Sequence, residues 1–528
     1  MTTTLVKKHG TLAAVILACA ALGGCGVNPV TGKKELQFVS EAQELSIGQQ
    51  QYAPMRQVEG GDLNVLPELT AYVNGVGQKL AAVSDRELPY EFVVLNNSVP
   101  NAWALPGGKI AVNRGLLTEL TSEAELAAVL GHEIVHAAAR HGAKAQERGT
   151  LMQAGMAAAQ IGAAVGGMDA GLANLALSGT AIGLQMVQMK YGREQELESD
   201  HYGMKYMKLA GYDPWGAVTL QETFVRLAGD NAKKQSWLDG LFASHPPSQE
   251  RVERNRATAG ELGRGGEIGA DSYATRVGPL LAMKPGYDKY DEAIAAARNK
   301  ELDKARTLAL EAARLLPKEG RAQQLLGDLA LAQKHPQEAL GYFRKAEDLN
   351  PGYFGSHLGT GIAAYQLGDK STATAAFERS VALLPTAPAA YYLGTMARDR
   401  GDRTAALQYF RTAAGSDSSY GKEAAAEYLR LDLPQNPGHY VAAAAQTDTN
   451  GRVYAIVENR APLALANIVV TPLLVDANGR ILQRGAALTV RGPLGSGQRA
   501  SAQISTGNLT AEQLRALKVR VESAQLAP

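Results

Sequence analysis

Cysteine is almost absent from this chain of 528 residues, which contains only Cys19 and Cys25. Both lie close to the N-terminus, so a disulfide framework that holds the folded part of the chain together is excluded. Stability must therefore come from packed cores or from a bound metal ion.

An excess of charge of one sign is also absent. The 53 Lys and Arg residues balance 52 Asp and Glu residues, which leaves a net charge of +1. Nucleic-acid-binding proteins usually carry a basic footprint, so the charge balance gives no support to a nucleic-acid partner. The hydrophobic content of 45% is enough for real cores, and the length predicts about three to four domains.

The N-terminal apolar run is short. It extends over residues 11–22 behind two lysines, and it is too short to cross a bilayer comfortably but typical of a secretory signal. The sequence LGGC at 22–25 resembles the cleavage box of bacterial lipoproteins. We therefore expect residues 1–24 to be a signal peptide and Cys25 to carry a lipid; an ordinary signal peptide beside an incidental cysteine is the alternative. No aspartate follows Cys25, which, for a Gram-negative source, favours the periplasmic face of the outer membrane.

The composition changes three times along the chain. Residues 25–258 mix predicted helices with a few strands, and the Gly-rich stretch that follows predicts a linker over 259–285. Ala, Leu and charged residues then recur at helical spacing over 286–432. The region 446–528 has the short alternating runs of β-strands. The sequence thus predicts a multidomain, mainly α protein with a small β domain at its end.

The helical region repeats every 34 residues. The positions that keep this step are a proline series (Pro317, Pro351, Pro385), an alanine series (Ala305, Ala339, Ala373) and a third series (Ala309, Phe343, Phe377). This period and order resemble the tetratricopeptide repeat, a stack of helical hairpins that form an α-solenoid. A generic helical bundle is the alternative, which the three series in register disfavour.

The last region contains six β-like runs: 453–459, 468–475, 480–483, 486–490, 500–505 and 518–523. Asn478-Gly479 lies between two of them and is a two-residue hairpin signal. We expect a small antiparallel β-sandwich.

Three of the nine histidines lie within VLGHEIVHAAARH, residues 129–141. Ser122 and Glu125 form a predicted capping box, from which a helix should run to about Arg148. His132 and His136 are four residues apart and therefore project from one face of that helix, where they can share a Zn²⁺ ion. Glu133 is rotated by about 100° from His132 and can act as general base on the attacking water, as in H-E-x-x-H peptidases. His141 lies on the other side of the helical wheel, and we interpret it as structural or exposed.

A hydrolytic zinc site needs a third protein ligand, and 191–214 supplies the candidates. Glu194, Glu196 and Glu198 compete in a helix that should end near Gly211. Glu196 shares an apolar face with Asp200, whereas the other two glutamates share a face that looks solvated. Buried carboxylates need partners, so Glu196 as ligand and Asp200 as the acceptor of a ligand histidine are favoured. A buried ion pair with an arginine is the alternative.

These motifs are together similar to the zinc metalloprotease family that includes the CAAX prenyl protease, HtpX and BepA. The resemblance rests on HEIVH, on Arg193, Glu196 and Asp200 in their spacing, on NAWALPGGKIAVNRGLL (101–117) and on SHPPSQER (244–251), and it covers about residues 35–260. It implies a zincin-like α+β metalloprotease domain. Together with the repeats, the layout most resembles the BepA-like periplasmic protease-chaperones, although the lipoprotein box and the C-terminal β region depart from that pattern.

The resemblance implies roles for individual residues. His132, His136 and Glu196 would bind one zinc ion, Glu133 would activate the water and Asp200 would support the ligands. His245 would approach the metal and hold the enzyme latent, or else only pack a turn or stabilise the oxyanion. Lys109, Ile110, Ala111, Val112 and Asn113 would form an exposed edge strand to which an extended substrate adds.

Residues 150–190 contain a single acid and no base before Lys190. Two packed helices or a lid beside the cleft fit this stretch better than a transmembrane hairpin, because its glutamines, asparagine and glycines weaken a membrane span.

The sequence therefore predicts a lipid-anchored periplasmic zinc endopeptidase that removes unfolded or misassembled outer-membrane proteins. The repeats would bring in a client or a protein partner, such as the outer-membrane assembly machinery, and the lipid on Cys25 would hold the chain at the membrane. The rival hypothesis is an assembly chaperone or scaffold that binds clients and seldom cuts them.

Overall fold

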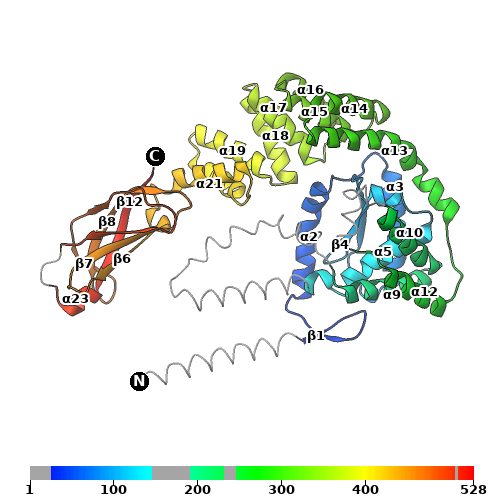
Figure 1. Ribbon diagram of the computed structural model, residues 1–528, viewed down its shortest axis with the longest axis horizontal. Coiled ribbons are helices and arrows are strands. Elements are labelled where there is room, and N and C mark those ends of the chain that lie inside the picture. The colour runs from blue at the N-terminus through cyan, green and yellow to red at the C-terminus, as the bar shows by residue number, and fades with distance from the viewer. Residues whose placement is uncertain (1–24, 145–190, 231–244, 506–508, 528) are drawn as a thin grey trace. The chain divides into compact units, whose positions relative to one another are not determined.

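The computed structural model describes residues 25–144, 191–230, 245–505 and 509–527 (Figure 1). The predicted signal peptide and the whole of the 150–190 stretch lie outside these residues, so the predictions for them stay untested. The chain forms two compact units, Met1–Leu384 and Pro385–Pro528. None of the described helices has the length and apolar character that crossing a bilayer requires.

A mixed three-stranded sheet lies in the first unit. Its strands are β3 (Glu91–Leu95), β4 (Ala102–Leu105) and β5 (Lys109–Asn113), in the order β3-β5-β4. β3 runs parallel to β5, and β4 runs antiparallel to it. The helices of this domain are α2 (Glu41–Val58), α3 (Pro67–Ala81), α4 (Arg114–Leu117), α5 (Glu123–Ala138), α9 (Arg193–Leu209), α10 (Trp215–Asp230) and α12 (Gln249–Leu262). A hairpin of β1 (Cys25–Val27) and β2 (Lys34–Leu36) precedes them.

Helix α5 lies at the centre of this domain, where all of its residues are buried. It crosses α9 at two glycines. A Cβ added to Gly131 would lie 3.0 Å from the Gly203 carbonyl oxygen, and one added to Gly203 would lie 3.0 Å from the His132 nitrogen. Because neither glycine has a side chain, the two backbones approach closely enough for nearby residues of both helices to share a site.

The interpretation of residues 259–285 as a linker is wrong for most of its length. α12 continues to Leu262, and α13 (Ala270–Arg298) begins after a short loop. Tyr273, Val277 and Leu280 of α13 follow helical spacing and are buried in the core of the domain that contains α5 and the three-stranded sheet. Pro279 and Pro285 within the helix conceal this pattern in the sequence.

The predicted repeats form antiparallel helical hairpins. In the first unit these helices are α14 (Leu302–Leu315), α15 (Gly320–Ala332), α16 (Pro336–Leu349), α17 (Phe354–Gln366) and α18 (Lys370–Leu383), stacked as Figure 1 shows. The repeated alanines and phenylalanines are buried. A Cβ added to Gly327 would lie 2.6 Å from the Phe343 ring, and one added to Gly361 would lie 2.5 Å from the Phe377 ring. Each glycine therefore makes room for the aromatic residue of the next helix, which is the physical basis of the period.

A buried polar cluster joins the first repeat helices to the domain that contains the three-stranded sheet. Glu319 accepts hydrogen bonds from Asn96 at 3.0 Å and from Tyr287 at 2.8 Å. Arg114 donates to Asn96 at 2.9 Å, and its guanidinium lies 3.6 Å from the centre of the Tyr287 ring. These repeats are therefore part of the same compact unit as that domain.

The second unit begins with the last repeat helices, α19 (Ala387–Asp399), α20 (Arg403–Ala414) and α21 (Ser419–Asp432), and the short α22 (Pro437–Tyr440). Two antiparallel sheets follow, with a common core, as predicted. The first sheet has the strand order β11 (Arg499–Gln503), β7 (Val453–Asn459) and β6 (Val441–Thr447). The second sheet contains β8 (Leu465–Val475), β9 (Ile481–Arg484), β10 (Leu488–Val490) and β12 (Leu517–Leu526). The short helix α23 (Ala511–Arg515) precedes β12. The β region begins at Val441, ahead of the predicted residue 446, because the alanine-rich β6 has no clear strand signal.

Candidate metal centre

Helix α5 starts where the sequence predicts and ends earlier. The Ser122 side chain accepts a hydrogen bond from the Glu125 nitrogen at 3.2 Å, which caps the helix. The Glu125 carboxylate bonds to the Thr121 nitrogen instead of completing the box. The helix ends at Ala138 rather than near Arg148, because Arg140 has a left-handed backbone with φ of 62°.

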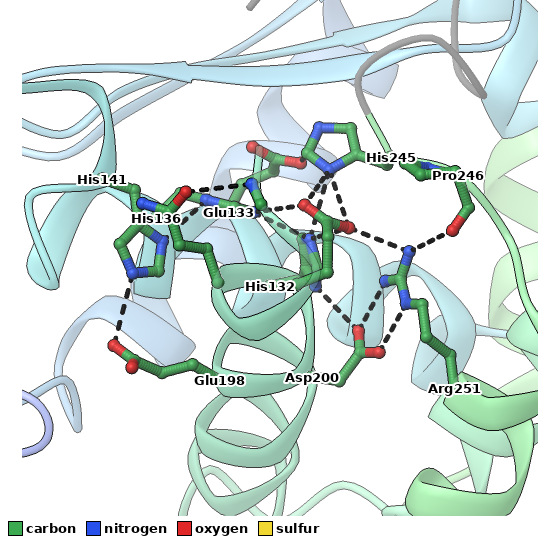
Figure 2. Close-up of polar contacts among 12 residues, drawn as sticks. His132, Glu133, His136, His141, Glu198, Asp200, His245, Pro246 and Arg251 are labelled. Carbon is green, nitrogen blue, oxygen red and sulfur yellow. Dashed lines mark hydrogen bonds and ion pairs between the residues drawn. The ribbon is translucent and has the colours of Figure 1, made fainter. Parts of the chain in front are cut away.

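The two histidines of HEIVH are drawn in Figure 2. Together with Glu196 of α9 they belong to one buried group of possible metal ligands. The Nε2 atoms of His132 and His136 are 2.9 Å apart. Glu196 Oε2 lies 3.5 Å from His132 Nε2, and its Oε1 lies 3.3 Å from His136 Nε2. Helical phase therefore selected the glutamate that reaches the histidine pair.

This donor set fits a zinc ion. One ligand atom from each of His132, His136, Glu196 and His245 lies within 4.8 Å of the other three, and all four residues are buried. Imidazole nitrogens and a carboxylate are the usual ligands of catalytic zinc, which keeps one position open for water or substrate. Burial lowers the pKa of His136 well below its ordinary value, which leaves this imidazole neutral with a lone pair for a metal.

Negative charge accumulates around His132. Burial alone would lower the pKa of this imidazole, but the carboxylates of Glu196 and Asp200 raise it to about 10. These carboxylates therefore favour positive charge beside His132, which a divalent cation bound at this place would supply.

Glu133 points into the site without being part of the donor set. Its side chain is buried, and its Oε2 atom has no hydrogen-bond partner among the described residues. Burial raises the pKa of this carboxyl group, while the neighbouring His245 and His132 oppose the shift. A buried carboxyl with a raised pKa and a free oxygen is suited to accept and return a proton.

Asp200 supports His132, as the sequence implies. Its Oδ1 atom lies 2.8 Å from His132 Nδ1, which orients the imidazole so that Nε2 faces the donor set. Arg251 of α12 donates two hydrogen bonds of 2.7 Å to the same carboxylate and lies 2.9 Å from Glu196. Burial would raise the pKa of Asp200, but the Arg251 guanidinium outweighs it and lowers that pKa. The buried acids thus have both a ligand role and an arginine partner, which the sequence presented as alternatives.

His141 and Glu198 take part in the site, which the sequence analysis missed. The chain reversal at Arg140 returns the His141 ring to His136, with 2.9 Å between the two Nδ1 atoms. Glu198 lies 3.3 Å from His141 Nε2 and is half-buried rather than solvated. His141 is therefore structural and not exposed, and it orients one of the expected metal ligands. In an uninterrupted helix His141 would lie on another face than His136, so helical spacing does not predict this contact. Only a signal that the helix ends at Ala138 could have predicted it.

His245 lies inside the donor set. Its Nδ1 atom is 3.1 Å from Glu196 Oε1 and 3.3 Å from His132 Nε2, and its Nε2 atom is 3.5 Å from Glu133. Arg251 donates to the carbonyl oxygen of the following Pro246 at 3.3 Å, which ties this loop to the acids of α9. This side chain therefore occupies the region where a fourth ligand would stand.

The predicted substrate strand is not at an edge. Lys109–Asn113 form β5, which lies between β3 and β4 with every residue buried. The prediction was wrong because strand order depends on chain crossovers that local alternation does not encode. Among the described strands of this sheet, β4 has a neighbour on one side only. The Asn113 nitrogen bonds to the Asn101 oxygen, so in antiparallel register the backbone groups of Ala102 and Ala104 point to that outer edge.

An apolar cavity of about 40 Å³ borders the polar site. Ala102 of β4 contributes to its wall, as do Val129, Met204, Leu220 and Phe224, and Glu133 and His245 lie at its polar end. Its size fits a small apolar side chain.

Comparison with known families identifies the class of protein that this site defines. Residues 67–259 match the sequence model of peptidase family M48, and residues 290–354 and 358–420 match that of the tetratricopeptide repeat. The chain therefore contains a zinc metallopeptidase domain of family M48 followed by tetratricopeptide repeats, as the motifs predict.

Individual relatives agree on this class. The chain is 31% identical to the β-barrel assembly-enhancing protease of Escherichia coli K12, over 41% of this chain and 46% of that protein. It is 32% identical to the mitochondrial metalloendopeptidase OMA1 of Schizosaccharomyces pombe, over 43% of this chain and 64% of that protein. It is 31% identical to the metalloprotease YcaL of E. coli K12, over 33% of this chain and 64% of that protein. The matches thus span less than half of the first relative and just under two thirds of the other two.

Proposed function

We propose that this protein is a zinc endopeptidase that hydrolyses peptide bonds in unfolded or misassembled outer-membrane proteins. The observation that carries the proposal is the position of Glu133. One oxygen of its buried carboxylate has no hydrogen-bond partner in the part of the chain that the structure describes, and the side chain lies beside the nitrogen and oxygen donors of His132, His136 and Glu196. This arrangement supplies a proton acceptor next to a metal site.

Each residue has a separate task in the reaction. A zinc ion held by His132, His136 and Glu196 would supply Lewis acidity at the scissile carbonyl. Glu133 takes a proton from the attacking water and returns it to the leaving amine. Asp200 and His141 keep the two ligand imidazoles oriented, and Arg251 holds Asp200 in its charged form.

The substrate binds along β4 in this proposal. An extended segment that adds to the outer edge of β4 forms hydrogen bonds through its backbone, which favours unfolded chains over a fixed side-chain motif. The apolar cavity next to Glu133 then receives a small hydrophobic side chain beside the cleaved bond. The β-barrel assembly-enhancing protease, which this chain resembles in part, supports β-barrel precursors as the clients.

The location and the partner are part of the same proposal. A lipid on Cys25 would hold the chain at the periplasmic face of the outer membrane, where misassembled barrel proteins occur. The tetratricopeptide repeats would bring in a client or the outer-membrane assembly machinery, because helical solenoids present extended surfaces to other proteins.

Metal removal tests the hydrolytic part of the proposal. The purified full chain should carry one zinc ion, and treatment with a chelator should abolish cleavage of a denatured outer-membrane β-barrel protein, followed by gel electrophoresis. Added zinc should restore cleavage, and the same barrel protein in its folded form should resist it. Zinc-free preparations that cleave as fast as zinc-loaded ones would contradict the proposal.

A chaperone that seldom cuts is the second candidate, and the position of His245 favours it. If this side chain fills the open position with a preference of about 1.4 kcal/mol, roughly one molecule in ten is open to substrate. The His245→Ala variant should then cleave the denatured barrel protein up to about tenfold faster, in a kinetic assay at equal zinc content. Unchanged or lost activity would count against latency, and His201→Ala, which changes a histidine on the outer side of α9, is the matched control.

A further inference from the structure

The β1–β2 hairpin presents apolar side chains to the outside. Along β2 and the two residues that follow it, Lys34, Leu36 and Phe38 are exposed, whereas Glu35 and Gln37 between them are half-buried. Leu36 is 57% exposed and Phe38 is 46% exposed. A surface strand usually has its polar residues outside and its apolar residues inside, so the polarity of this strand is reversed.

Polar contacts explain why the inner face of the hairpin stays in place. Glu35 pairs with Lys144, and Gln37 accepts a hydrogen bond from Arg140. Asn28 donates to Glu198 of α9 at 3.1 Å. The hairpin is thus fixed to the protease domain through its polar residues, which leaves the apolar residues on the side that faces away from it.

The register brings the predicted lipid-bearing residue to the same place. Cys25 pairs with Leu36, and Val27 pairs with Lys34. Residues directly opposite each other in an antiparallel pair belong to the same face of the sheet. Val27 is 54% exposed. The outer face of the hairpin therefore contains Val27, Lys34 and Leu36 around the register position of Cys25, with Phe38 two residues beyond the end of β2.

We propose that this face lies against a lipid bilayer and orients the protease domain at the membrane. The proposal rests on the lipid attachment at Cys25 that is part of the proposed function. A lipid chain that enters the bilayer from Cys25 would bring Leu36 and Val27 to the bilayer surface, because they are the nearest residues in the register. Exposed apolar side chains gathered in one patch mark an interaction site. The exposed Lys33 and Lys34 at the edge of the face suit anionic headgroups.

Fluorescence quenching tests this contact in the full chain. Tryptophan at an inserted position loses emission when the surrounding lipids carry bromine. Leu36→Trp should therefore lose emission in vesicles of phosphatidylethanolamine and phosphatidylglycerol with brominated acyl chains, compared with the same vesicles without bromine and after subtraction of the parent chain. Leu482→Trp, which replaces a leucine that is 62% exposed in β9, is the control and should keep its emission.

A second variant measures the contribution of the side chain. Leu36→Gln should weaken the association of the chain with these vesicles by roughly tenfold in a flotation assay, while its melting temperature stays that of the parent because Leu36 is exposed. Equal emission of Leu36→Trp in brominated and ordinary vesicles would overturn the proposal. That result would mean that lipid does not contact this face, and it would hold regardless of whether another protein or another part of the chain covers it. Cleavage of denatured barrel protein by the same preparations reports separately on the proposed function, and Cys25→Ser reports on the lipid anchor.

Discussion

Replacement of Glu133 by glutamine is expected to lower kcat for cleavage of a denatured β-barrel protein by about two to four orders of magnitude, the usual contribution of a positioned general base. Glutamine has nearly the same shape as glutamate but cannot accept a proton. Because Glu133 is not in the donor set, the variant should keep its zinc. The measurements are steady-state cleavage rates and zinc content by mass spectrometry.

The matched control is Glu194→Gln, which makes the same chemical change at an exposed position of α9. It should leave both the rate and the zinc content unchanged. If Glu133→Gln still cleaves at the parent rate, another group takes the proton and the assignment fails. If the variant is inactive yet fully supports outer-membrane integrity in cells, proteolysis is not the main function and the chaperone hypothesis is favoured.

The inactive Glu133 variant also identifies clients. A protein that binds its substrate but cannot cut it should accumulate the substrate at the site, and mass spectrometry of material that copurifies with the variant would name it. Outer-membrane β-barrel precursors are the expected class.

Replacement of Arg251 by methionine is expected to cost about 3–5 kcal/mol of stability, because it leaves buried carboxylates without their partner. Arg251 is 5% exposed, and it contacts Asp200 twice and Glu196 once. Methionine fills a similar volume but donates no hydrogen bond. The expected result is a lower melting temperature of the zinc-free chain, together with weaker zinc binding, since Asp200 orients His132.

The control for this change is Arg193→Met, where the arginine pairs with Glu250 on the surface. Exposed ion pairs contribute about 0–1 kcal/mol, so the melting temperature should barely move. Arg251→Lys keeps the charge but loses the two-pronged contact with Asp200, and it should fall between the parent and Arg251→Met. Equal melting temperatures of Arg251→Met and the parent would show that Arg251 does not compensate the buried acids.

Local patterns predicted those parts of the molecule that depend on neighbouring residues. The i, i+4 spacing of His132 and His136 selects one helix face, and the buried face of α9 separates Glu196 from Glu194. The repeat period was visible because Gly327 and Gly361 must make room for Phe343 and Phe377. Six strands of the β domain followed from alternation, whereas β6 was missed because alanine has little strand preference.

Other features depended on contacts between distant segments. The left-handed backbone of Arg140 brings His141 back to His136. This turn depends on how the chain after α5 packs, which helical spacing does not encode. The central position of β5 depends on which strands pair, and helical spacing in α13 was hidden by two internal prolines. For the same reason, the outward apolar face of the β1–β2 hairpin is visible only once its polar face is seen to bond to the domain.

The sequence by itself determined the class of this protein, because zinc ligation and helical repeats both require particular residues at short, fixed spacings. Only the tertiary structure decided which groups surround the two histidines and which strand lies at an end of the sheet: His245 among the donors, Arg251 on the acids, His141 behind a ligand, and β4 rather than β5 at the edge. The physical reason is that all of them except His141 are far from the histidine pair along the chain. Their distances are set by the close crossing of α5 and α9 at two glycines and by the packing of α12 against α9, whereas His141 is returned to the site by the turn at Arg140.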